Sequence, residues 1–175
     1  MAKEIELRRH TDNDGDVLTS DGVTHAVQIG RRLRGSYRLI AASNALRAVQ
    51  TAGCLLAGLG ETVPEGVVVE PGLRSHREGD WRAAYSARGK GDLASLREAD
   101  PDLVRDDSVV LAAGLRTVAD RIHDGERALA IGHSPTSEAG VFGLTGEIIE
   151  PLGKGEGVVV IGEGDQFRVG QRLPA

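Results

Sequence analysis

The sequence predicts an α/β fold of three layers, in which a mostly parallel central sheet is flanked by helices on both faces. The first observation behind this prediction is that short apolar runs alternate with longer amphipathic segments along the 175 residues. Strands that alternate with helices are typical of a parallel sheet that helices cover on both sides. The second observation is the length, which suits one domain, and no repeat or linker divides residues 1–175.

The strands are predicted from apolar or alternating runs of residues. Lys3–Arg9 alternates polar and apolar side chains, whereas Tyr37–Ala42 is apolar enough for a buried strand. Val67–Val69 is a short β-branched run that precedes a Pro-Gly pair, which is a turn signal. The remaining expected strands are Arg127–Ile131 and a closing pair, Gly157–Ile161 and Gln166–Leu173.

The helices are predicted from apolar residues at helical spacing and from residues that cap helix ends. Between Gly72 and Asp107 this spacing is weak, so that segment is expected to be irregular apart from one short helix. The expected helices run from Thr19 or Ser20 to Leu33, from Ser43 or Asn44 to Leu59, and over Leu93–Ala99, Val109–Ile122 and Pro135–Leu144.

The composition excludes several classes of function. The net charge of −5 argues against a nucleic-acid binder, and two Phe, two Tyr and one Trp are too few for a base-stacking platform. No run approaches the ~18 apolar residues of a membrane span, and the amino terminus lacks an apolar signal segment. We therefore expect a cytoplasmic protein without membrane association. No interface stripe stands out, so the oligomeric state is left open.

Three of the predicted strands end in residues that carry chemistry. Arg9-His10 ends the first strand, Ser43 to Ala52 opens the helix after the second, and Gly132-His133-Ser134 follows a later one. The carboxyl ends of the strands form the edge where open α/β folds hold their ligands. The sequence therefore brings two arginines and two histidines to one edge of the sheet.

These motifs resemble those of the histidine phosphatase superfamily, the phosphoglycerate mutase-like proteins. Arg9-His10 matches the end of the family's Arg-His-Gly motif, although Thr11 replaces the glycine. The helix opening matches Ser-x-x-x-Arg-x-x-Gln-Thr-Ala, and Gly132-His133-Ser134 matches the family's Gly-His-Ser. Three matches in the family's order predict a phosphoglycerate mutase-like fold. The resemblance implies that His10 is a nucleophile that becomes phosphorylated and that His133 stabilises the transferring phosphoryl group.

Phosphoryl transfer requires cations around the phosphate oxygens, and the planar fork of arginine matches two oxygens at once. Arg9 and Arg47 are therefore predicted to bind the phosphate. Ser134 and Asn13 are further candidates for phosphate binding. A helix-capping role explains Ser134 equally well, and a turn role explains Asn13 equally well.

The general acid is missing from its expected place. The family's Leu-x-Glu-x-x-x-Gly-x-Trp segment has a counterpart that begins at Leu73, but Ser75 stands where the glutamate is expected. Glu78 is the first candidate for the acid, and Glu138 is the alternative. If neither serves, substrates with better leaving groups, such as phosphohistidine, are favoured.

The expected activity is a metal-independent phosphatase acting on a phosphorylated small molecule or phosphoprotein. The sequence has no His-x-x-x-His or Cys-x-x-Cys spacing, and arginines beside the histidines disfavour a cation, so neither metal nor cofactor is expected. Two alternatives stay open. One is a mutase-type phosphotransferase, and the other is a non-catalytic module that binds phosphate or a phosphoprotein.

Overall fold

A computed structural model describes all residues 1–175 and contains a six-stranded sheet with the order β5-β4-β6-β1-β7-β8. Strands β1, β4, β5 and β6 are parallel, whereas β7 runs antiparallel to β1 and β8 antiparallel to β7. The predicted α/β fold with a mostly parallel sheet is thus confirmed. The strands are β1 (Lys3–Arg9), β4 (Leu39–Ala42), β5 (Val67–Val69), β6 (Arg127–Gly132), β7 (Gly157–Glu163) and β8 (Gln166–Leu173).

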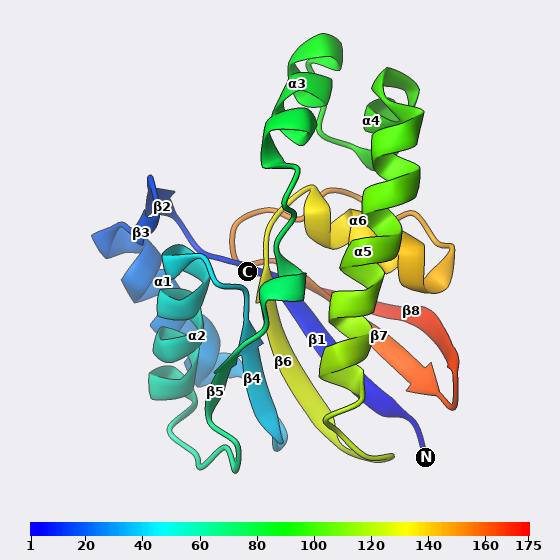
Figure 1. Cartoon of the computed structure of the whole chain (residues 1–175). Helices are drawn as coiled ribbons and strands as arrows, with labels where there is room; N and C mark the ends of the chain where they lie inside the picture. The colour runs from blue at the N-terminus through cyan, green and yellow to red at the C-terminus, as the bar shows by residue number, and fades with distance from the viewer.

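Two pairs of helices cover the two faces of the sheet (Figure 1). Helices α1 (Ser20–Arg32) and α2 (Leu46–Leu59) pack on one face, and α5 (Pro101–Ala119) and α6 (Thr136–Thr145) pack on the other. Helices α3 (Glu78–Arg88) and α4 (Leu93–Ala99) stand beyond the carboxyl edge of the sheet, at the top of Figure 1. None of these helices is both long and apolar enough to cross a membrane.

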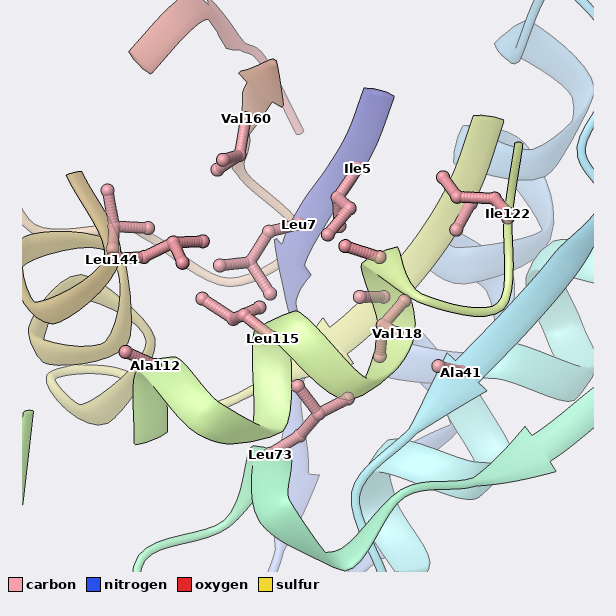
Figure 2. Packing of buried hydrophobic residues seen from close by; sticks show 14 of the residues in the cluster. Ile5, Leu7, Ala41, Leu73, Ala112, Leu115, Val118, Ile122, Leu144 and Val160 are labelled. Carbon is pink, nitrogen blue, oxygen red and sulfur yellow. The ribbon is translucent and has the colours of Figure 1, made fainter. Parts of the chain in front are cut away.

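Alternation along the strands divides the buried residues between the two faces. On β1, Ile5 and Leu7 pack with Leu115 and Val118 of α5 and with Leu144 of α6, as Figure 2 shows. On the opposite face, strand residues that include Ile40 and Ile131 pack against α1 and α2. Burial on both faces explains why β4 and β6 read as continuous apolar runs rather than as alternating ones.

A third, smaller cluster joins the outer helices to the rest of the molecule. Trp81 of α3 and Leu93 and Leu96 of α4 pack against Leu103 and Leu111 of α5. This cluster lies outside the sheet and contains no strand residue. Helices α3 and α4 are therefore held through α5 and α6, and not by the sheet itself.

Three local features differ from the sequence-based expectation. Helix α3 falls in the segment expected to be irregular, and α5 begins at Pro101 instead of Val109, with the Asp100 side chain accepting a hydrogen bond from the Leu103 N–H. Polar residues 105–108 concealed the first turns of α5, because Asp107 and Ser108 are buried despite their polarity. A two-strand hairpin, β2 (Asn13–Asp14) and β3 (Val17–Leu18), also went unpredicted.

The start of α2 is corrected as well. Neither Ser43 nor Asn44 is its cap, because the helix begins at Leu46 after Ala45. Asp16 of the hairpin provides the cap instead, and its carboxylate accepts hydrogen bonds from the Leu46 and Arg47 N–H groups at 3.2 and 3.5 Å.

Candidate active site

The three predicted motifs meet at the carboxyl edge of the sheet, where β6 lies between β1 and β4. The backbone pairing of the strands continues one residue past each strand end. The His10 N–H donates to the Gly132 carbonyl, and the Ser43 N–H donates to the Ile131 carbonyl, both at 3.1 Å. The register of the sheet thereby fixes His10, Ser43 and His133 side by side.

His10 is held as a neutral imidazole with its Nε2 lone pair facing the site. The side chain is buried, with 4% of the residue exposed. Its Nδ1 lies 2.8 Å from the Thr11 carbonyl oxygen. A carbonyl only accepts, so Nδ1 carries the proton and Nε2 carries the lone pair. The Arg47 Nε–H donates to that lone pair at 3.3 Å. The backbone contact at Nδ1 therefore fixes the direction of the Nε2 lone pair.

His133 is oriented by the same logic, through side chains. The Arg47 Nη2–H donates to its Nδ1 at 3.2 Å, so the proton of the neutral ring lies on Nε2, which donates to the Ser43 hydroxyl at 2.7 Å. His133 is buried, with 7% of the residue exposed. Gly132 permits the tight turn before it, because a Cβ there would lie 2.5 Å from the Ser137 Oγ.

Arg47 is the centre of the cluster. Its guanidinium lies between the two imidazoles, whose ring centroids are 5.2 Å apart, and its Nη1 forms an ion pair with Asp16 at 2.8 Å. Thr51, one turn further along α2, donates to the Arg47 carbonyl and accepts from the Thr11 N–H. The helix opening thus ties the arginine and the backbone beside His10 into one unit.

Both histidines are neutral near pH 7. Burial is the largest cause that lowers the pKa of His10 to about 4, and the positive charges of Lys154, Arg47 and Arg9 add to the shift. Burial also lowers the pKa of His133 to about 3, with Arg47 as the next cause. A histidine can act as a nucleophile only in the neutral form, and His10 has that form near pH 7.

Arg9 and Asn13 both contact the loop that precedes β7. The Arg9 Nη1 donates to the Leu152 carbonyl at 2.9 Å, and its buried Nε has no partner. The Asn13 amide donates to the Gly15 carbonyl at 2.8 Å, as in a turn, while its oxygen accepts from Lys154. The structure thus gives Asn13 a turn contact and a lysine partner.

Ser134 follows His133, but its hydroxyl points to Glu138, to which it donates at 2.5 Å. Glu138 also accepts the Leu152 N–H at 2.8 Å and is 1% exposed. Burial raises the pKa of this carboxyl. Glu138, on α6, therefore connects Ser134 to the loop before β7.

Glu78 is the first residue of α3. It lines a cavity of about 270 Å³ that opens beside His133. Its carboxylate is 4.0 Å from the Arg47 Nη2 and accepts from the Arg74 Nε at 2.6 Å. The Arg74 hydrogen bond holds the pKa of Glu78 below its usual range. The residues around this cavity are Arg47, Glu78, Trp81, Arg82, Tyr85, His133, Ser134, Pro135 and Thr136.

Ser75, which stands at the family's glutamate position, has a structural partner. Its hydroxyl donates to the buried Asp107 carboxylate at 2.6 Å, and the Trp81 Nε1–H donates to the same oxygen at 2.6 Å. The position thus links the chain before α3 to α5.

Sequence reasoning missed Asp16 and Lys154, which come from loops with no motif, and Arg74, which lies at a position where the motif beginning at Leu73 specifies no residue type. The signal for Asp16 was the acidic run from Asp12 to Asp16, and the signal for Lys154 was a single lysine in the Gly-Lys-Gly of residues 153–155. No group of three or more His, Cys, Asp or Glu side chains is placed to hold a metal ion.

Known proteins resemble this chain at the level of family and of fold. A family model described as histidine phosphatase superfamily (branch 1) matches residues 2–137. A search of curated proteins finds no match.

Solved structures share the fold at low sequence identity. A phosphoserine phosphatase from Entamoeba histolytica in complex with 3-phosphoglyceric acid has a TM-score of 0.71 and 15% identity over 99% of this chain and 98% of that one. A phosphoglycerate mutase from Bacillus anthracis has a TM-score of 0.66 and 16% identity over 97% and 92%. The protein histidine phosphatase SixA complexed with tungstate has a TM-score of 0.65 and 17% identity over 97% and 96%.

Proposed function

The chain belongs to the histidine phosphatase superfamily, and on that basis we propose that it is a phosphatase that works through a phosphohistidine on His10. The observation that carries the proposal is the arrangement of Arg47 between two neutral imidazoles, with the His10 Nε2 lone pair facing the guanidinium. A phosphate that takes over the donors of Arg47 comes to lie between His10 and His133. Attack on phosphorus then needs no proton removal from the nucleophile.

In the first step the His10 Nε2 forms a bond to phosphorus while the bond from phosphorus to the leaving oxygen breaks. The ring becomes positively charged, and its Nδ1–H donates to the Thr11 carbonyl, which stabilises that charge. The Arg47 guanidinium faces the phosphoryl oxygens, where negative charge is spread in the transition state. His133 donates to them in the tautomer that carries its proton on Nδ1, with Nε2 then accepting from the Ser43 hydroxyl. Water then attacks phosphorus while the bond between phosphorus and the His10 Nε2 breaks. The proton that the water loses returns to the group that protonated the leaving oxygen, and inorganic phosphate is released.

The leaving oxygen must take up a proton, and we assign this donor to Glu78. Its position on the cavity beside His133 supports the assignment. The Arg74 hydrogen bond works against it, because a donor must be protonated and this contact lowers the pKa of Glu78. Substrates that leave without much help, including phosphohistidine and aryl phosphates, are therefore favoured over alkyl phosphates.

The decisive experiment combines hydrolysis with trapping of the intermediate. Wild type is incubated with a labelled aryl phosphate, with and without chelator, and quenched in base, in which phosphohistidine survives. The expected result is label on His10 and turnover that chelator leaves intact, both lost in His10→Asn. His123→Asn is the matched control, since this exposed histidine follows α5 far from the site and should retain full activity.

Other results would point to the alternatives. Label that is returned to a second substrate rather than to water would identify a mutase-type phosphotransferase. Binding of inorganic phosphate without label on His10 and without turnover on phosphohistidine or phosphomonoesters would identify a non-catalytic module.

Glu78→Gln tests the proton donor separately. Hydrolysis of an alkyl phosphate should fall about 10²-fold, because a general acid contributes roughly 10²–10⁴. Hydrolysis of an aryl phosphate should change less than about threefold, because its leaving group needs little protonation. Equal losses on both substrates would contradict the assignment.

A further inference from the structure

Lys154 lies in the loop between α6 and β7, and no motif includes it. It is one of only three lysines in the chain, against eighteen arginines, and it is the one that lies beside the candidate site. Its Nζ donates to the Asn13 side-chain oxygen, three residues beyond His10. An ammonium group has three donors, so two of them have no partner in the protein. The lysine therefore lies at the edge of the site with two N–H donors available to a ligand.

The loop that carries Lys154 is fixed on both sides of this residue. The Leu152 N–H donates to the buried Glu138 carboxylate, and the Leu152 carbonyl accepts from Arg9. The Gly155 N–H donates to the Arg9 carbonyl at 3.2 Å, and the Arg9 N–H donates to the Glu156 carbonyl at 2.9 Å.

Gly155 itself permits this path. It has a φ of +79°, and a Cβ there would lie 2.7 Å from the Ile29 Cδ1. The backbone around Lys154 is thus held to β1, one residue before the nucleophile.

The charges around Lys154 are arranged for an anion. Arg9 at the end of β1, His10 just beyond it, Asp12 and Asn13 in the segment that follows, and Arg47 of α2 lie around it. Among the charged groups that lower the pKa of His10, Lys154 has the largest effect, ahead of Arg47 and Arg9. Burial and the two arginines in turn lower the pKa of Lys154 to about 8. Three cations gather at His10, and only Asp12 opposes them at the lysine.

We infer that Lys154 is a phosphate-binding residue, whose ammonium binds the phosphoryl oxygens from the loop before β7. This inference deepens the proposed function and rests on its phosphate site. Asn13 then positions the lysine rather than contacting phosphate directly. The loop before β7 thus adds a third cation, Lys154, to Arg47 of the helix opening and Arg9 of the Arg-His pair.

The test measures binding of inorganic phosphate by calorimetry, so it does not depend on turnover. At pH 7 Lys154→Met should weaken phosphate binding by about 10-fold or more, since a hydrogen bond to a charged group is lost. Lys154→Arg should remain within about threefold of wild type. Lys90→Met is the matched control, since Lys90 is exposed between α3 and α4, and it should bind phosphate like wild type.

The pH dependence separates a ligand from a merely structural residue. Phosphate affinity of the wild type should fall between about pH 8 and 9, as the Lys154 ammonium loses its proton. The fall should be absent in Lys154→Met and in Lys154→Arg, because neither side chain titrates there. Thermal unfolding of each variant verifies that the fold is intact.

Equal phosphate affinity of Lys154→Met and wild type, or the same pH profile in both, would overturn the inference. Wild type that fails to bind phosphate would overturn it as well. Lysine-dependent phosphate binding in a protein that hydrolyses nothing would keep the inference and reject the phosphatase proposal.

Discussion

Two regions form the candidate site, and they are built differently. The carboxyl edge of the sheet carries His10, Ser43 and His133 on backbone hydrogen bonds that continue the strand pairing. The opposite wall of the cavity is α3, which is anchored by a small cluster and by the hydrogen bonds of Trp81 and Ser75 to Asp107. One region is fixed by the central sheet, and the other by a few long-range side-chain contacts.

The difference separates two tasks. The groups that touch phosphorus in the proposed reaction come from the sheet edge, where a displacement would require the strands to shift. The groups that face the leaving group, Glu78, Arg82 and Tyr85, come from α3. Changes at the edge should therefore abolish chemistry, whereas changes in α3 should alter stability and substrate preference. The predictions below test this division, beginning with the largest effect.

The first prediction concerns acid stability. His10 and His133 are neutral in the fold with pKa values of about 4 and about 3, whereas an unfolded histidine has a pKa of about 6.5. Between these values the unfolded chain binds more protons, so the stability is fully present above pH 6.5 and is lost as the pH falls through 4 toward 3. His10 alone should account for about 3 kcal/mol of this loss. Chemical unfolding at several pH values measures it. A double variant, His10→Gln with His133→Gln, should show a flatter dependence, and an unchanged slope would contradict the assignment.

The second prediction concerns Arg47. Lysine cannot donate to His10 and His133 and pair with Asp16 at once, because it lacks the planar fork of donors. Arg47→Lys should lower kcat/KM on an aryl phosphate by at least about 10²-fold, which corresponds to about 3 kcal/mol. Arg97→Lys on α4, away from the site, is the control. A loss below tenfold would mean that a positive charge at residue 47 is sufficient for activity and that the planar guanidinium is not required.

The third prediction concerns the anchor of α3. Trp81→Phe removes the indole N–H that Asp107 accepts, which should cost about 1–2 kcal/mol of unfolding free energy. Turnover of an aryl phosphate should stay within about threefold of wild type at a temperature where the variant is folded. A loss of turnover comparable to that of Arg47→Lys would show that the two regions are not separable.

The smallest effect is expected at Tyr85, which is half-exposed on the cavity. Tyr85→Ala should raise KM for an aryl phosphate about threefold with kcat unchanged, because it removes contact with the leaving group and none with the phosphate. An equal fall in kcat would place Tyr85 in the chemical step instead.

The same division explains what the sequence could predict. His10, Arg47 and His133 each follow an apolar run that ends at a fixed place in the sheet, so local pattern was sufficient to bring them together. Helix α3 was missed because only Trp81 and Ala84 are buried on it, and its main polar anchor, Asp107, lies 26 residues away from Trp81.

Loop side chains were the other difficulty. Asp16 caps α2 across 30 residues, and Lys154 reaches Asn13 across 141. Periodicity and motif spacing contain no information about such contacts, which depend on how loops from distant parts of the chain meet. Ser75 illustrates the same limit, since the sequence indicated a missing acid but not the Asp107 partner.

The guanidinium of Arg47 has one further consequence. Its Nε, Nη1 and Nη2 each have a partner in the folded chain, so the side chain already has a single orientation. Ordering a free arginine side chain costs up to about 2 kcal/mol of conformational entropy. The arginine loses this entropy when the chain folds, before any ligand binds. An incoming oxyanion then replaces existing hydrogen-bond partners of Arg47 and does not have to order the side chain.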